Sequence, residues 1–127
     1  MFRTKMAIVV VLMLISTGPM NIIIKSEAEN IPEWGVYVYM AGDNTLYEEL
    51  DDDLNEMKMV GSNENLEIVA ITDQITNNDS HVYHVIKDGL EETPLNQIND
   101  TWENEINMGN KNTLRDFMIW ASSQYSV

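Results

Sequence analysis

Two short apolar runs on either side of one amphipathic segment constrain the fold of this chain more than any other feature. Residues 34–41 read WGVYVYMA and residues 66–72 read LEIVAIT, and both are rich in β-branched, aromatic and aliphatic side chains. Both runs are largely apolar on their two faces, which is typical of strands covered on both sides in a parallel sheet. Two such strands joined by a helix form a βαβ unit, so the sequence predicts an α/β fold.

The segment between these runs has the pattern of a helix. Its apolar residues recur at spacings of four, four, three and three, and acidic side chains occupy the rest of its surface. We expect Thr45 and Glu48 to form a capping box at its start and Gly61 to end it. The predicted apolar stripe contains Leu46, Leu50, Leu54, Met57 and Val60.

A third strand and a second helix follow. Residues 81–87 read HVYHVIK and predict an edge strand or the first arm of a hairpin, closed by Asp88-Gly89. Residues 90–109 are polar, and we expect irregular structure there. Residues 110–113 predict the start of a last helix, after which an alternating α/β fold would return to its sheet. The pattern therefore predicts the front part of a longer domain. The apolar face of that helix would contain Leu114, Phe117, Met118 and Ala121.

The first 28 residues have the pattern of an export signal. Arg3 and Lys5 precede an uninterrupted apolar run at residues 6–15, and small residues near position 28 fit cleavage after Ala28. The run is shorter than the roughly 20 residues that span a bilayer, and an uncleaved membrane anchor is the alternative. We expect an exported protein with a signal peptide at 1–28 and a domain at 29–127.

Charge and cysteine content exclude several classes of protein. The 21 acidic and 7 basic residues give a formal charge of −14, which argues against binding to nucleic acid or to an anionic membrane surface. The chain has no cysteine. Disulfide frameworks, zinc-thiolate sites and a cysteine nucleophile within this chain are therefore excluded.

The turn after the first predicted strand is one candidate site. It consists of Gly42, Asp43 and Asn44. Open α/β sheets bind ligands at the carboxyl ends of their strands, so Asp43 or Asn44 could line or support a site. The simpler interpretation is a turn that leads into the helix, because these residue types favour turns.

Acidic residues on the first helix are a candidate for Ca²⁺, the one cofactor that the sequence suggests. Calcium prefers several carboxylate oxygens that converge from a flexible loop. Successive side chains on a helix diverge by about 100°, so a solvated helix face is the simpler interpretation. The acids are Asp51, Asp52 and Asp53, with Glu48, Glu49 and Glu56 nearby.

The two histidines, His81 and His84, lie three residues apart on a predicted strand. They therefore point to opposite faces and cannot bind one metal together. Either could act as a general base, but the chain has no cysteine to activate and no Gly-x-Ser-x-Gly motif. We assign no catalytic, cofactor-binding or metal-binding residue to this chain.

Four segments together resemble the N-terminal part of the clostripain-like cysteine peptidases. In chain order they are a strand with a Gly-Asp-Asn turn, a helix with its Val-Gly-Ser end, a strand ending in Asp, and an Asn-Met-Gly segment before a helix. Their order and spacing carry the resemblance, which extends from about Trp34 to Tyr125. The segments lie at 34–46, 52–62, 66–74 and 107–121.

The resemblance implies a caspase-like α/β sheet with flanking helices, of which this chain has the first strands and helices only. It implies a secreted cysteine endopeptidase that cleaves proteins or peptides after basic residues. In the family, the catalytic histidine ends the next strand in a His-Gly segment, and the cysteine ends the strand after that. His81 and His84 lie too early to match, whereas Asp43 and Asn44 match a family turn with a structural role. We expect this chain to be inactive without the C-terminal half of the peptidase domain as its partner.

Two other functions remain open. A non-catalytic acidic interaction module would give a soluble, monodisperse and cooperatively folded product of residues 29–127. A calcium-stabilised extracellular domain would show a rise in melting temperature with Ca²⁺ but not with Mg²⁺. The peptidase fragment, by contrast, is expected to fold poorly alone.

Overall fold

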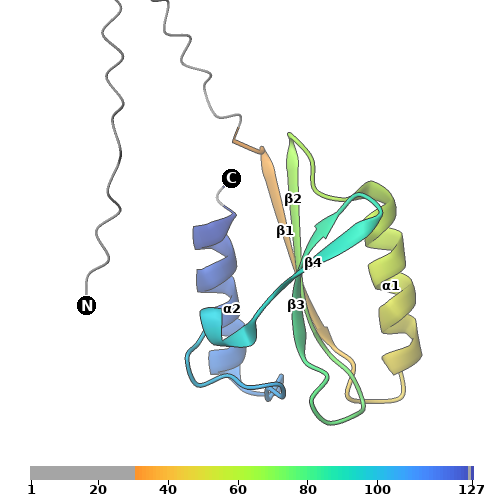
Figure 1. The fold of residues 1–127 in the computed structure, drawn as a ribbon, viewed down its shortest axis with the longest axis vertical. Helices are drawn as coiled ribbons and strands as arrows, with labels where there is room; N and C mark the ends of the chain where they lie inside the picture. The colour runs from red at the N-terminus through yellow and green to blue at the C-terminus, as the bar shows by residue number, and fades with distance from the viewer. Residues whose placement is uncertain (1–30, 126) are drawn as a thin grey trace, which may run out of the picture.

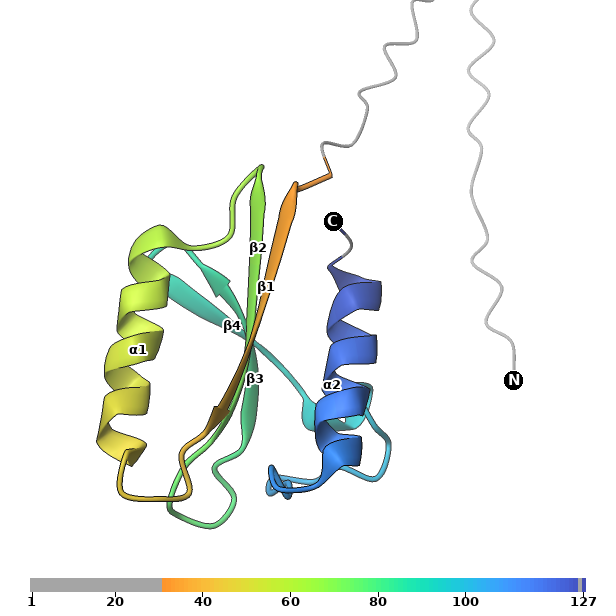
Figure 2. The same cartoon turned by 180° about the vertical axis from the view of Figure 1, so that it is seen from behind.

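The computed structural model describes residues 31–125 and 127, and the predicted signal peptide at 1–28 lies outside this part of the chain. Within it, a four-stranded sheet lies between two helices, one on each face (Figures 1 and 2). No helix in residues 31–125 is long and apolar enough to cross a lipid bilayer. The elements are β1 (Trp34–Ala41), α1 (Tyr47–Val60), β2 (Leu66–Asp73), β3 (His81–Ile86), β4 (Gly89–Thr93), the 3-10 turn η1 (Leu95–Gln97) and α2 (Lys111–Gln124).

The strands follow one another across the sheet in the order β1-β2-β3-β4. β1 pairs with β2 in parallel, with Trp34 opposite Leu66 and Ala41 opposite Asp73. The pairs β2–β3 and β3–β4 are antiparallel. The predicted βαβ unit and the hairpin after His81 are therefore both confirmed.

β2 is the most buried strand because both of its faces are covered. Ile68 and Ala70 pack with the apolar residues of α1, whereas Val69 and Ile71 pack against α2. The alternation follows from the two-residue period of a strand. The α1 face also contains Leu50, Leu54 and Val85, and the α2 face contains Val82, Leu95, Ile106, Phe117 and Ala121.

The first helix starts differently from the prediction. Its N-cap position is Leu46, which makes no side-chain cap, so the predicted capping box of Thr45 and Glu48 is wrong. Asn44 takes this role because its Oδ1 accepts from the Leu46 N–H at 2.8 Å. The predicted end is confirmed, since Gly61 adopts φ +67° and its N–H donates to the Met57 carbonyl at 2.9 Å.

The predicted apolar faces of both helices are only partly right. On α1, Leu50 and Leu54 are buried, but Leu46 and Val60 are exposed, at the N-cap and the last residue of the helix. On α2, Phe117 and Ala121 are buried as expected. The third buried position is Thr113, and both Leu114 and Met118 are exposed.

Residues 90–109 contain regular structure, although the sequence predicts an irregular segment there. β4 and η1 both lie in or overlap this region. β4 carries Glu91 and Glu92 and has no apolar alternation, and its pairing with β3 determines its structure. The helix that follows begins as expected, because the Asn110 side chain accepts from the Asn112 N–H at 3.0 Å.

Candidate functional site

The turn after β1 is hydrogen-bonded to the end of the parallel strand β2. The Gly42 N–H donates to the Asp73 carbonyl at 2.6 Å, and Asn44 Nδ2 donates to the Ala41 carbonyl at 2.8 Å. A Cβ on Gly42 would lie 2.7 Å from a Leu50 methyl and 2.9 Å from the Asp73 carbonyl oxygen. No side chain fits at this position, so Gly42 and Asn44 have structural roles.

A cavity of about 540 Å³ lies at the carboxyl ends of β1 and β2. This is the edge of the sheet at which α/β proteins place their ligands. Three carboxylates, Asp43, Asp73 and Glu105, line it together with the Asn-Met-Gly segment at 107–109. The structure thus brings Asp43 to the predicted location, and it adds two acids that sequence reasoning had not selected.

Asp73 is a buried carboxylate at the floor of this cavity, only 4% exposed. Burial raises the pKa of Asp73 above its ordinary value; the hydrogen bond from the Ser80 hydroxyl opposes this shift, and the nearby acids Glu105, Asp79 and Asp43 add to it. The same hydroxyl accepts from the Ile106 N–H at 3.0 Å. Ser80 therefore connects the end of β2 to the segment that precedes α2.

Asp79 organises the loop between β2 and β3. Its carboxylate accepts from the N–H groups of Gln74 and Thr76, at 3.1 and 2.7 Å, and from the Thr76 hydroxyl. Partial burial raises the pKa of Asp79, but these donors, the Thr76 hydroxyl first, outweigh that effect and lower the pKa below its ordinary value. Asp79 is therefore held as a carboxylate.

The carboxylates of Asp73, Asp79 and Glu105 converge, with one oxygen from each within 4.8 Å of the others. Oxygen donors of this kind suit Ca²⁺. All three also accept from protein donors, since Ser80 binds Asp73 and the Asn78 N–H binds Glu105 at 2.7 Å. The aspartates at 51–53 lie on α1 and outside this group, and calcium binding stays a prediction.

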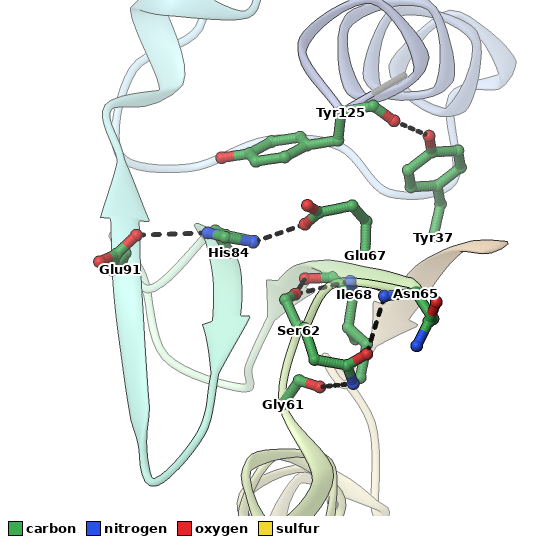
Figure 3. Close-up of polar contacts among 10 residues, drawn as sticks. Tyr37, Gly61, Ser62, Asn65, Glu67, Ile68, His84, Glu91 and Tyr125 are labelled. Atoms are coloured by element: carbon green, nitrogen blue, oxygen red, sulfur yellow. Dashed lines mark hydrogen bonds and ion pairs between the residues drawn. The ribbon is translucent and has the colours of Figure 1, made fainter. Parts of the chain in front are cut away.

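The side chains of the two histidines lie on opposite faces of the sheet, as predicted. His81 pairs with Glu92 at 2.7 Å and stacks on Tyr83, whose side chain packs on the α1 side. His84 stacks instead on Tyr125, which follows α2 (Figure 3). In the described part of the chain neither imidazole is paired with a nucleophile, and His84 lies between two carboxylates.

Sequence reasoning missed these carboxylate partners. Glu91 lies opposite His84 in the β3–β4 register, and Glu67 comes from the neighbouring strand β2. The two-residue loop between β3 and β4 could have revealed Glu91, because the loop length of a hairpin determines which residues of its strands lie opposite each other. This inference requires that β4 be predicted as a strand, and its polar sequence GLEET does not predict one.

Comparisons with known proteins agree on one group of enzymes. A model of the clostripain family matches residues 38–127. The fold is similar to that of a B. fragilis cysteine protease, with a TM-score of 0.56 and 20% identity, over 75% of this chain and 80% of that one. It is also similar to an inactive zymogen C11 protease from Parabacteroides distasonis, with a TM-score of 0.58 and 20% identity, over 76% of this chain and 28% of that one. No curated protein gives a significant match.

Proposed function

Because this chain belongs to the clostripain family of peptidases, we propose that it forms the N-terminal scaffold of an exported cysteine endopeptidase. The remainder of the peptidase domain would supply the catalytic histidine and cysteine. The chain spans 28% of the length of the zymogen that it resembles, so it accounts for only part of such a protein. Cleavage after basic residues belongs to the same proposal and rests on the family resemblance.

The observation that carries this proposal is the open side of β1. Within the described residues β1 lies at the end of the sheet, and its Val36 is 44% exposed. A groove of about 530 Å³ lies between β1 and α1; Val38, Met40 and Leu50 form part of its lining, and the acids Glu49, Asp53 and Glu56 of α1 also line it. A further strand beside β1 would cover this apolar surface and satisfy the free backbone groups of the strand.

The position of Val127 supports the same location. A methyl carbon of Val127 lies 3.4 Å from the place that a Cβ on Gly35 would occupy, at the start of β1. The chain thus returns to the N-terminal end of β1 after crossing the sheet (Figure 2). A strand that continued from this point along the open edge would run parallel to β1, as in a second βαβ unit.

The catalytic groups would come from the remainder of the peptidase domain. The chain has no cysteine, and we assign its histidines structural contacts. In a cysteine peptidase, an imidazole assists formation of the thiolate and backbone donors stabilise the oxyanion. The role of this chain would be to hold the first two parallel strands in place, so that the ends of the next strands meet at the edge where the Asp73 cavity opens.

Complementation tests the proposal. The coding nucleic acid is first read beyond the Val127 codon for strands that end in His-Gly and in cysteine. Residues 29–127 are then co-expressed with that product, and hydrolysis of Arg- and Lys-containing peptides is measured. We expect activity only when both parts are present. A well-folded assembly of both parts without hydrolytic activity would contradict the proposal.

Matched variants locate the contact between the two parts. Val36→Glu places a charge on the open side of β1 and is expected to abolish assembly and activity together. Met59→Glu is the control, because Met59 is more exposed, at 69%, lies on α1 and does not line the groove beside β1. It is expected to leave both assembly and activity unchanged.

Export is a second part of the proposal and has its own test. N-terminal sequencing of the protein from the culture medium is expected to begin at Glu29. Retention of residues 1–28 in a membrane fraction would indicate the uncleaved anchor instead.

A further inference from the structure

The His84 ring lies between two carboxylates from different strands. Its Nε2 is 2.8 Å from Oε2 of Glu67 on β2, and its Nδ1 is 3.2 Å from Oε2 of Glu91 on β4 (Figure 3). The side chains of His84 and Glu67 are only 17% and 20% exposed, whereas that of Glu91 is 63% exposed. One imidazole therefore connects three adjacent strands on a single face of the sheet.

The two contacts together require a donor on each ring nitrogen. An ionised carboxylate can only accept hydrogen bonds, and a neutral imidazole has a single N–H to donate. Both contacts are therefore made together only by the imidazolium, which carries a proton on each nitrogen. Loss of one proton leaves one of the two glutamates without its partner.

The end of α2 contacts the same ring. Tyr125 follows the helix, and its ring stacks on His84 with the centroids 4.6 Å apart. The Tyr125 carbonyl accepts from the Tyr37 hydroxyl at 2.7 Å, and Trp120 meets the Tyr125 ring edge-on. Tyr125 is thus held by contacts with β1, with β3 and with its own helix.

The titratable groups around His84 come from four elements. They are Glu67 on β2, Glu91 on β4, Tyr125 after α2 and Tyr37 on β1. Burial first, and then Glu67, raise the pKa of Tyr37; burial, Glu67 and Glu91 raise that of Tyr125. Both phenols therefore stay protonated at neutral pH.

We propose that Glu67, His84, Glu91 and Tyr125 form a protonation-dependent latch on the C-terminal end of α2. With the imidazolium in place, the ring is fixed between the two carboxylates and Tyr125 is packed on it. With the neutral imidazole, one carboxylate is released, the ring is free to turn, and the last turn of α2 loosens. The latch lies wholly within the described residues and does not depend on the proposed peptidase function.

Amide hydrogen exchange tests the latch on the whole protein as isolated. Protection factors for residues 121–125, corrected for intrinsic exchange, are compared at pH 5 and pH 8. We expect protection to fall about fivefold at the higher pH, the effect of one net hydrogen bond. His81→Gln is the matched control, because His81 pairs with a single glutamate on the opposite face, and it is expected to behave like the wild type.

Two variants of His84 separate protonation from packing. His84→Gln should give low protection at both pH values, because no imidazolium can form. His84→Arg should keep high protection at both, because a guanidinium stays charged, donates to two carboxylates and stacks on an aromatic ring. The proposal is overturned if wild-type protection is the same at pH 5 and 8, if His84→Gln retains the pH dependence, or if His84→Arg loosens at pH 8.

Discussion

The Tyr39 hydroxyl donates a hydrogen bond to the Met108 carbonyl, 3.0 Å away and 69 residues later in the chain. The ring of Tyr39 also packs against Phe117, with centroids 6.2 Å apart. Together the two contacts connect β1 to the segment before α2 and to the middle of that helix. A strand at the end of the sheet is thereby held in place on its α2 side.

Tyr39→Phe tests this connection. The change keeps the ring packing but leaves the Met108 carbonyl without its donor, so we expect a loss of about 1 kcal/mol in the free energy of unfolding. Urea denaturation followed by circular dichroism gives this value. Tyr47→Phe is the control, because the Tyr47 hydroxyl bonds only to the exposed carboxylate of Glu48. A loss of equal size in both variants would contradict the importance of the long-range bond.

The start of α1 gives a second prediction. Asn44→Ala removes the acceptor for the Leu46 N–H and the donor to the Ala41 carbonyl, and it should destabilise the protein by about 1 kcal/mol. Thr45→Ala should change stability by less than about 0.5 kcal/mol, because Thr45 caps nothing. Thermal unfolding of the two single variants decides between this cap and the capping box that the sequence pattern predicts.

Gly61 gives a third prediction, on backbone conformation. Its φ is +67°, and a Cβ at this position would lie 2.2 Å from the Lys87 backbone nitrogen. Gly61→Ala should therefore cost at least about 2 kcal/mol, from strain and from displacement of the β3–β4 turn. Gly109→Ala is the matched control, because its Cβ would meet only the movable side chain of Asn107. Chemical denaturation should show a much smaller loss for that control.

The acid dependence of stability provides a fourth prediction, in which two aspartates have opposite signs. The pKa of Asp79 is lowered by folding, so its stabilising contribution is present above the ordinary aspartate pKa and is lost as the pH falls through the folded value. The pKa of Asp73 is raised, so its contribution favours low pH and is lost as the pH rises through the folded value.

Unfolding measured between pH 3 and 7 separates the two groups. Asp79→Asn should destabilise the protein at pH 7 and flatten the decline of stability in acid. Asp73→Asn should preserve stability at pH 7 or increase it, and should steepen the decline in acid. Identical changes in the two pH profiles would contradict the assigned shifts.

The sequence predicts the parts of the fold that follow from local periodicity. The apolar runs of β1 and β2 and the helix between them are evident because each buries a regular face. β4 is not evident, because its glutamates are determined by pairing with β3 and not by burial. The buried position Thr113 is missed for a related reason. It is buried, and its hydroxyl donates to the Asn107 carbonyl at 2.8 Å, which no apolar pattern reveals.

The candidate site was predictable only in its location. Asp43 lies two residues after the end of β1, so the edge of the sheet at which the cavity opens could be inferred from the sequence. The other acids come from the end of β2, from the next loop and from the segment before α2. Their convergence depends on Ser80, which bonds both Asp73 and the Ile106 N–H, and no contiguous motif records that contact.

The two ends of the sheet are protected against self-association to different degrees. The β1 sequence WGVYVYMA contains no charged residue, whereas β4 carries two glutamates in five residues. Charged edge strands resist pairing with other chains, so aggregation of the isolated protein should begin at β1. Long-range repulsion from the acidic surface opposes such contacts, and it weakens as salt shortens the Debye length to about 10 Å at 0.1 M. Low ionic strength should therefore keep this chain dispersed, and added salt should promote its association through the uncharged edge.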